Sequence, residues 1–268
     1  MTKTIVSLIA VGLTAGLAGT APAATPFDGP GPQKVVSAAE GPDCTVFHPE
    51  NLGGKPHPVI LWGNGTRSKV PAYTPMLSQW ASYGFVVAAA NTNTAGSGKP
   101  IMDCLDYLTA ENSRVGSPYQ GKLDLKKIGV SGHSQGGGGT IMAARDPRIT
   151  TTAPIEPYTV GLGYLVGAEA AQHGPMLLLS GGDDTTAVPE KNRLPVFTNG
   201  NTPIFWATLK GASHAVPATT DSGQFRVITT AWFLYQLTGD KTATAQFTGD
   251  KCGACASPDW IVQRNGKS

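Results

Sequence analysis

The sequence predicts an α/β fold with a mostly parallel central sheet and helices on both faces. Continuous apolar segments of strand length alternate with segments of helical periodicity, which is typical of parallel strands buried on both faces. A G-x-S-x-G motif, Gly132 to Gly136, lies between an apolar strand and a predicted helix. Acidic residues and a histidine follow it, each after a later predicted strand. Together these observations predict the α/β-hydrolase fold.

The N-terminal segment, Met1 to Ala23, is predicted to be a cleaved secretory signal peptide. Lys3 supplies positive charge, Ile5 to Leu17 is apolar, and Ala21-Pro22-Ala23 matches an A-x-A cleavage site. A membrane anchor is disfavoured because the apolar run contains glycines and is shorter than the ~20 residues of a spanning helix. We therefore expect a secreted protein, extracellular or periplasmic, with no membrane anchor after cleavage.

The remaining chain, residues 24–268, is expected to form a single α/β-hydrolase domain. The formal net charge of the whole chain is +2, and its Lys and Arg residues are scattered along the sequence. Nucleic-acid-binding proteins usually concentrate basic residues on one face. We therefore expect no nucleic-acid partner, and we expect a monomer.

Strands and helices alternate through the middle of the chain. Strands are predicted over Pro58 to Trp62, Phe85 to Ala90, Ile128 to Ser131, Met176 to Ser180 and Ile204 to Leu209. Helices are predicted over Tyr73 to Tyr83, Ile101 to Ala110, a segment starting near Gln135, and Phe225 to Leu237. The connection between Ala144 and Met176 must include a further strand. It leaves little room for a helical lid, so no large lid is expected.

Ser134 is the candidate nucleophile of the motif. A serine hydroxyl needs a base to accept its proton and an acid to orient that base, and α/β-hydrolases order them as Ser, Asp or Glu, then His. His214 follows the strand that ends at Leu209, and the acid is expected within Gly181-Gly182-Asp183-Asp184. His173, the other histidine after Ser134, precedes these aspartates and is disfavoured.

Two backbone amides are candidates for the oxyanion hole. One is the N–H of Gln135, directly after the nucleophile, and the other is expected from the loop Trp62 to Thr66. We predict Gly65 for the second donor. The alternative is that Gly65 is only a turn glycine.

The four cysteines are expected to form two disulfides, because an exported chain folds in an oxidising compartment. Cys252 and Cys255 are predicted to form a local bridge, with a zinc half-site or a redox pair as alternatives. Cys44 would then pair with Cys104. The sequence itself leaves the connectivity open.

Several stretches, each in the same order, resemble a known family. They are WASYGFVVAAANTN, CLDYL, GHSQGGGG, APIEPYT, DDTTA, LKGASH and TAWF. The family is that of the bacterial cutinase-like polyester hydrolases, also described as triacylglycerol lipases, which include poly(ethylene terephthalate) hydrolases. The similar stretches run through most of the mature chain.

The resemblance implies roles for individual residues. Asp184 is implied as the catalytic acid, because the family's Asp precedes a short segment ending in Ala, matched by Thr185 to Ala187. Tyr158 falls where the family carries an aromatic residue that flanks the acyl group, although it could instead support the loop. His133 is expected to contact substrate beside the nucleophile. Gln135 stands where the family usually has Met.

The sequence therefore predicts a secreted serine esterase, cutinase- or lipase-like, that forms an acyl-enzyme. Its expected partner is a carboxylic ester, with polymeric esters among the candidates. Neither an organic cofactor nor a metal is expected, because this chemistry needs none. The alternatives are a carbohydrate esterase or acyltransferase on the same fold, or a catalytically silent binding protein of that fold.

Overall fold

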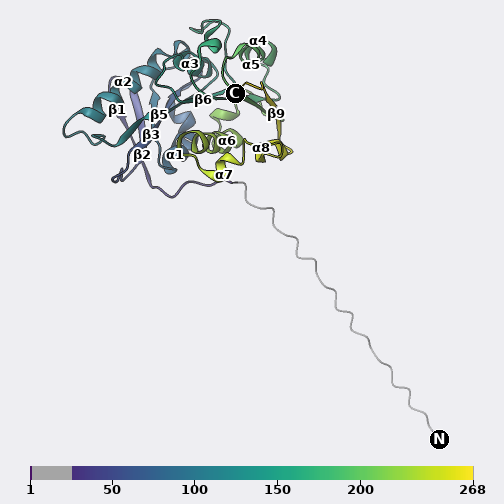
Figure 1. Ribbon diagram of the computed structural model, residues 1–268, viewed down its shortest axis with the longest axis horizontal. Helices are drawn as coiled ribbons and strands as arrows, with labels where there is room; N and C mark the ends of the chain where they lie inside the picture. Colours follow the sequence, from purple (N-terminus) through teal and green to yellow (C-terminus); the bar gives the residue numbers. More distant parts are fainter. Residues whose placement is uncertain (2–25, 268) are drawn as a thin grey trace.

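A mixed sheet of nine strands forms the centre of the protein (Figure 1). A computed structural model describes residue 1 and residues 26–267, so the predicted signal peptide, Met1 to Ala23, lies outside the described residues after Met1. The strands are β1 Val35–Glu40, β2 Cys44–Pro49, β3 His57–Gly63, β4 Val86–Ala90, β5 Leu123–His133, β6 Thr151–Ile155, β7 Met176–Gly181, β8 Ile204–Leu209 and β9 Trp260–Arg264.

The strand order in the sheet is β1-β2-β4-β3-β5-β6-β7-β8-β9. Neighbouring strands from β4 to β8 are parallel, whereas β1, β2 and β9 pair antiparallel at the two edges. The carboxyl ends of the parallel strands therefore meet at one edge, where ligands bind in open α/β sheets. The mostly parallel sheet of the α/β-hydrolase fold is confirmed.

Helices cover both faces of the sheet (Figure 1). The α-helices are α1 Thr74–Ser82, α2 Lys99–Ser113, α3 Gln135–Ala143, α4 Pro189–Asn192, α5 Leu194–Asn199, α6 Gly223–Phe233, α7 Lys241–Thr244 and α8 Gly253–Ala256. Short 3-10 helices are η1 Val70–Tyr73, η2 Ala95–Ser97, η3 Ala168–Ala171 and η4 Val216–Ala218, and a π-helical turn, η5, spans Leu234–Thr238. None of these helices is long and apolar enough to cross a bilayer.

Strands β3, β4, β7 and β8 are apolar along most of their length because each packs against a core on both faces of the sheet. In β3, Ile60 and Trp62 pack on the face covered by α1 and α6, while Val59 and Leu61 pack on the opposite face under α2. Successive strand residues point to opposite faces, so both sets must be apolar. This explains why the buried strands could be predicted without an alternating pattern.

The observed elements differ from the predicted ones mainly at their ends. Strand β8 has the predicted bounds, whereas β5 begins at Leu123 rather than Ile128. The closing helix α6 stops at Phe233, and the chain continues as the π-helical turn η5. Strands β1, β2 and β9 were not predicted. No helical lid lies between α3 and β7, where the described chain contains only β6, loop segments and η3.

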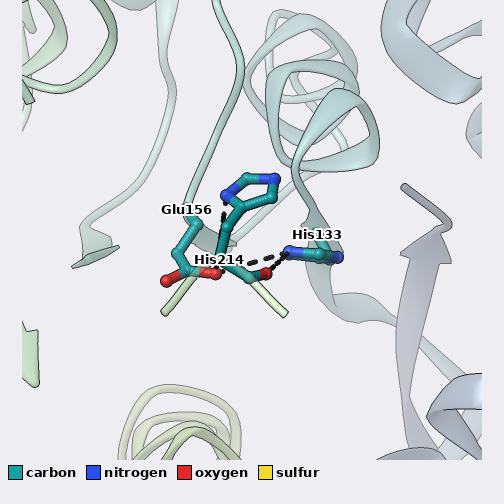
Figure 2. A group of neighbouring side chains, drawn as sticks. All are labelled: His133, Glu156 and His214. Atoms are coloured by element: carbon teal, nitrogen blue, oxygen red, sulfur yellow. Dashed lines mark hydrogen bonds and ion pairs between the residues drawn. The ribbon is translucent and has the colours of Figure 1, made fainter. Parts of the chain in front are cut away.

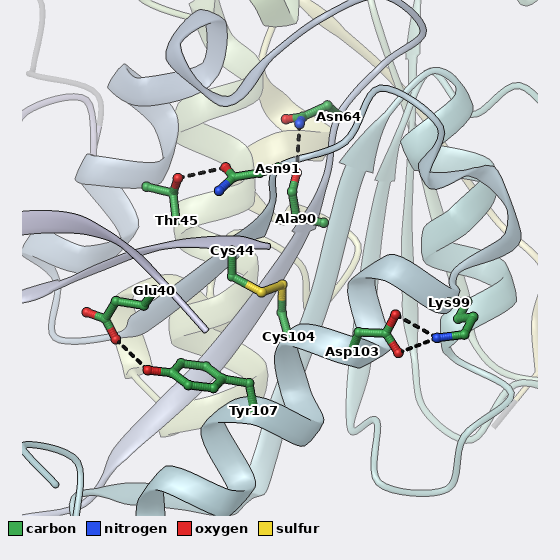
Figure 3. The surroundings of a disulfide bond; sticks show 10 residues. All are labelled: Glu40, Cys44, Thr45, Asn64, Ala90, Asn91, Lys99, Asp103, Cys104 and Tyr107. Atoms are coloured by element: carbon green, nitrogen blue, oxygen red, sulfur yellow. Dashed lines mark hydrogen bonds and ion pairs between the residues drawn. A yellow bond between two sulfur atoms is a disulfide. The ribbon is translucent and has the colours of Figure 1, made fainter. Parts of the chain in front are cut away.

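Both predicted disulfides are present. Cys44 of β2 is bonded to Cys104 of α2, with Cα atoms 6.0 Å apart (Figure 3). Cys252 is bonded to Cys255 at the start of α8, which leaves neither sulfur free as a thiolate ligand for zinc. In the chain-entropy model the first bridge, which closes the longer segment, contributes about 4 kcal/mol and the second about 2.

Candidate active site

Ser134 lies on a sharp turn between β5 and α3. Its backbone has φ 55° and ψ −118°, a conformation that costs free energy for a residue with a side chain. The motif glycines make this turn possible. A Cβ atom on Gly132 would collide with the carbonyl of Gly136, and one on Gly136 would collide with the carbonyl of Gly63 on β3. The G-x-S-x-G spacing therefore reflects the close approach of β3, β5 and α3 beneath the serine.

The glycine run that follows, Gly136 to Gly139, packs the first turn of α3 against neighbouring backbone. Cβ atoms at the last three positions would collide with Pro157, Tyr158 and Ala95 in turn. Each glycine weakens a helix by about 1 kcal/mol relative to alanine. Close packing against the loop after β6 and against η2 explains why glycine occupies these positions.

The three residues predicted for catalysis come together at the carboxyl edge of the sheet. The His214 Nε2 atom lies 2.8 Å from Ser134 Oγ. On the other side of the ring, Nδ1 lies 3.1 Å from Asp184 Oδ2. This second contact is within ion-pair distance, although its angle is not that of a straight hydrogen bond. The three side chains come from the turn after β5 and the loops after β7 and β8.

Asp184 is buried and held by several donors. Its Oδ1 accepts hydrogen bonds of 2.9 Å from the N–H groups of Thr186 and Ala187, and its Oδ2 accepts one of 3.1 Å from Arg193. Burial alone would raise the pKa of Asp184. Three favourable contacts outweigh burial and lower the pKa of Asp184 to about 2: those with His214, with the Ala187 amide and with the charge of Arg193. Asp184 is therefore ionised at neutral pH.

The competing acid and base candidates lie elsewhere. Asp183 is exposed, whereas its neighbour Asp184 is buried beside His214. His173 is exposed as well, with Nε2 3.2 Å from the carbonyl of Arg145. The structure thus brings Asp184 and His214 to the serine and leaves the other two side chains outside the cluster.

His133 is buried under the site, with both ring nitrogens engaged. Nε2 lies 2.9 Å from the carbonyl oxygen of His214, which can only accept, so Nε2 carries the proton. Nδ1 of the neutral ring must then accept from the Tyr73 hydroxyl at 2.9 Å. Burial, and secondly the nearby His214, lower the pKa of His133 to about 3, which keeps the ring neutral. This placement beneath His214, 5% exposed, favours support of the site over the expected substrate contact.

The two predicted oxyanion donors differ in their surroundings. Gln135 begins α3, so its N–H has no partner within the helix. The Gly65 N–H, in contrast, donates to the Tyr73 hydroxyl at 3.2 Å. In this arrangement the Gly65 amide continues the chain of hydrogen bonds through Tyr73 to His133.

The segment after β6 brings apolar side chains to the surface beside α3. Tyr158, half-buried, donates its backbone N–H to the carbonyl of Ser134 at 2.8 Å. Residues 160–166, here called the apolar loop, then expose the side chains of Val160, Leu162, Leu165 and Val166. The Gln135 side chain anchors this loop by donating to the carbonyl of Leu162 at 3.3 Å.

Two buried titratable residues of the site were missed by sequence reasoning. Glu156, directly after β6, is fully buried with φ 45°, and neither carboxyl oxygen has a hydrogen-bond partner. Burial is the main cause that raises its pKa to about 8. Arg193 is also fully buried, against Asp184. A lone glutamate within the apolar stretch TTAPIEPY was the available signal for Glu156; Arg193 lies in a polar stretch that resembles a surface segment.

Glu156 lies within ion-pair distance of two histidines (Figure 2). Its Oε2 is 3.4 Å from His133 Nε2 and 3.8 Å from His214 Nδ1. One ligand atom from each of these three residues lies within 4.8 Å of the others, a grouping that could in principle hold a metal ion. We assign no metal site here, because a metal would have to displace Asp184 from His214 and the His214 carbonyl from His133.

Comparison with known proteins identifies the family of the chain. The family model described as PET hydrolase-like matches residues 18–259. A bis(hydroxyethyl) terephthalate hydrolase of Streptomyces coelicolor is 26% identical over 66% of this chain and 57% of its own length. A cutinase of Thermobifida alba is 28% identical over 85% of this chain and 81% of its own length. A cutinase of Thermobifida fusca is 28% identical over 75% of this chain and 68% of its own length. The chain therefore belongs to the PET hydrolase-like family of α/β-hydrolase-fold enzymes.

Proposed function

We propose that the protein is a secreted serine esterase that hydrolyses carboxylic esters, polyesters among them, through Ser134, His214 and Asp184. One observation carries the proposal. The His214 ring lies between the Ser134 hydroxyl, at 2.8 Å, and the ionised Asp184 carboxylate, at 3.1 Å. A serine, a base and an orienting acid in this arrangement form the constellation that activates a serine for acyl transfer.

The first half of the reaction forms the acyl-enzyme. His214 Nε2 accepts the Ser134 proton while Oγ bonds to the ester carbonyl carbon, and the resulting imidazolium is stabilised by Asp184. The Gln135 N–H and a second donor in the loop Trp62 to Thr66 hold the oxyanion. Gly65 remains the candidate for that donor, and its amide would have to turn from the Tyr73 hydroxyl toward the substrate. The imidazolium then protonates the leaving alcohol oxygen as the ester bond breaks.

The second half releases the acid. His214 accepts a proton from water while the water oxygen bonds to the acyl carbon. The tetrahedral intermediate collapses, the bond to Ser134 Oγ breaks, and the imidazolium returns its proton to that oxygen.

An open, apolar surface supports extended esters as substrates. Tyr158 and the apolar loop lie beside the nucleophile, and four side chains of the loop are 50–91% exposed. Apolar chains and rings of an ester can pack against such a surface. The relatives named as cutinases and as a terephthalate-ester hydrolase favour the same substrate class. We expect hydrolysis of short- and medium-chain p-nitrophenyl esters without interfacial activation, and of an aliphatic polyester.

Secretion is proposed from two independent features. Met1 to Ala23 has the pattern of a signal peptide, and the protein contains two disulfides, which persist in oxidising compartments. We propose further that residues 24–268 act as one domain and as a monomer. Mass spectrometry of the exported protein should find an N-terminus at Ala24.

Covalent labelling tests the proposed chemistry directly. A fluorophosphonate probe should modify Ser134, identified by peptide mass spectrometry, and Ser134→Ala should remain unlabelled. A protein that hydrolyses nothing and is not labelled would be a silent binding protein. Rates on p-nitrophenyl esters, triglyceride, polyester film and acetylated sugars separate the remaining alternatives, because a carbohydrate esterase would prefer the sugars.

A further inference from the structure

We propose that Glu156 is a second carboxyl group of His214, a positioning residue that shares the Nδ1 atom with Asp184 and supports the imidazolium when Asp184 is absent. The inference rests on the proposed function of Ser134 and His214. It starts from a buried carboxyl group that the reaction described above does not use.

The geometry directs both acids toward one nitrogen. Asp184 Oδ2 lies 3.1 Å from His214 Nδ1, and Glu156 Oε2 lies 3.8 Å from the same atom. They arrive from different strands, since Asp184 follows β7 and Glu156 follows β6. Small residues leave space for Glu156, because a Cβ on Gly181 would collide with its Oε1. Both carboxyls are thus part of the wall around the imidazole.

Glu156 is held there despite two unfavourable features. A non-glycine residue at φ 45° is in the left-handed region, and a buried carboxyl without a hydrogen-bond partner loses its hydration. Such features persist where the surrounding structure fixes them, often at functional sites. An apolar side chain of similar volume, such as methionine, would avoid this desolvation. A role in the site accounts for the carboxyl.

Arg193 explains why a second acid is useful. Its guanidinium donates to Asp184 Oδ2, the same oxygen that faces His214. Part of the negative charge of Asp184 is therefore balanced by Arg193 rather than by the imidazolium. A negative charge on Glu156 would add to the field at Nδ1, and opposite charges that close strongly favour the protonated ring. An ionised Glu156 would thus help to stabilise the imidazolium that forms as Ser134 attacks the ester.

The protonation state of Glu156 depends on its charged neighbours. The titratable and charged groups that face it are His133 at the end of β5, Asp184 after β7, Arg193 between α4 and α5, His214 after β8, and Tyr73 at the end of η1. Burial, the first cause, keeps the pKa of Glu156 near 8, and the negative charge of Asp184 also raises it. Glu156 is therefore neutral at pH 7 and becomes charged in weakly alkaline solution. Loss of Asp184 would make it easier to ionise.

A pH profile and a double-mutant cycle test the proposal. The rate kcat on a soluble p-nitrophenyl ester would be measured from about pH 6 to about pH 10. The parent should show a second rise near pH 8, and Glu156→Gln should lack it, with kcat roughly fivefold lower on the alkaline side. In the Asp184→Ala background, Glu156→Gln should remove at least about tenfold of the residual kcat, more than in the parent.

Two further variants make every outcome decisive. Glu40 lies on β1, outside the site, and its carboxyl accepts a hydrogen bond of 2.8 Å from the Tyr119 hydroxyl. Glu40→Gln should therefore keep the parental dependence of kcat on pH. Glu156→Met replaces Glu156→Gln if the amide variant does not fold. Equal profiles for parent and Glu156 variant, with no added loss in the Asp184→Ala background, would overturn the role of Glu156. An active Ser134→Ala would instead overturn the proposed function itself.

Discussion

The polar cluster around His214 and the apolar loop are close along the chain but differ in burial and chemistry. Glu156 is fully buried among charged groups, whereas Val160, shortly after it, is 50% exposed and Val166 is 91% exposed. In the cluster the contacts are hydrogen bonds or ion pairs. The exposed side chains of the loop are uncharged and have no hydrogen-bonding groups. The difference suggests that bond cleavage and attachment to the substrate surface depend on separate residues and can be altered separately.

Removal of the proposed nucleophile should separate the functions of the two regions most clearly. Ser134→Ala should lower kcat by about a millionfold, because the loss of a catalytic serine removes the covalent route. Adsorption to a polyester film should stay near the parental level, since the apolar loop is intact. Depletion of protein from solution by the film measures adsorption, and the p-nitrophenyl ester rate measures chemistry. Joint loss of both would show that the two regions do not act separately.

The two adjacent aspartates test which acid within the cluster orients His214. Asp184→Asn should lower kcat by about ten thousandfold, because an amide beside Nδ1 favours the wrong tautomer of His214. Asp183→Asn is the matched control, since this side chain is exposed, and kcat should change by less than about twofold. Steady-state kinetics on a soluble ester distinguish them. The reverse result would assign the acid to Asp183.

The buried cluster should also make the free energy of unfolding depend on pH, whereas the exposed side chains of the apolar loop should not. An unfolded glutamate has a pKa of about 4.3, whereas burial raises that of Glu156 to about 8. The folded protein therefore keeps a proton that the unfolded chain releases. The contribution of this bound proton to the free energy of unfolding is complete below about pH 4 and is lost as pH rises toward about 8.

Glutamine does not titrate, so Glu156→Gln should be stabilised relative to the parent as pH rises. The difference in the free energy of unfolding should grow between about pH 4 and about pH 8, by at most about 5 kcal/mol. Urea unfolding at several pH values measures it, and the contribution of Asp184 is common to both proteins. A difference that is constant with pH would mean that Glu156 is ionised throughout.

The smallest expected effect concerns the apolar loop. The double variant Leu162→Ser and Val166→Ser should lower polyester hydrolysis by about tenfold, because less apolar area is buried against the polymer. Hydrolysis of a soluble ester should change by less than about twofold. Val115→Ser, an 84% exposed residue between α2 and β5, is the matched control. Equal losses on both substrates would place the loop in the reaction rather than in surface contact.

Buried strands and helices were predictable, while the sheet edges were not. Strands β3, β7 and β8 are continuous apolar runs because both of their faces are covered, and their predicted bounds were close to the observed ones. Strands β1 and β9 are largely exposed and mix polar with apolar residues. Their backbone pairing with β2 and β8 provides the register. No local pattern in the sequence records such pairing.

Within the site, residues that belong to a motif or follow a predicted strand could be found from sequence. Ser134 is in the G-x-S-x-G turn and His214 follows β8, so their meeting could be expected. Arg193 and Tyr73 contact the site only through tertiary structure. Arg193 reaches Asp184 from between two short helices, and Tyr73 reaches His133 from η1. Their roles depend on which strands are neighbours, which the sequence alone leaves undetermined.

The packed glycines at the start of α3 define where this enzyme can vary by mutation. Every amino acid other than glycine has a Cβ atom, and a Cβ at Gly136, Gly138 or Gly139 would collide with a backbone carbonyl. Amino-acid substitutions at these glycines are therefore expected to be removed by selection. The apolar loop is under no such constraint at its exposed positions. Mutant libraries that keep residues 132–139 fixed and diversify residues 160–166 would search for new ester preferences without losing the proposed nucleophile.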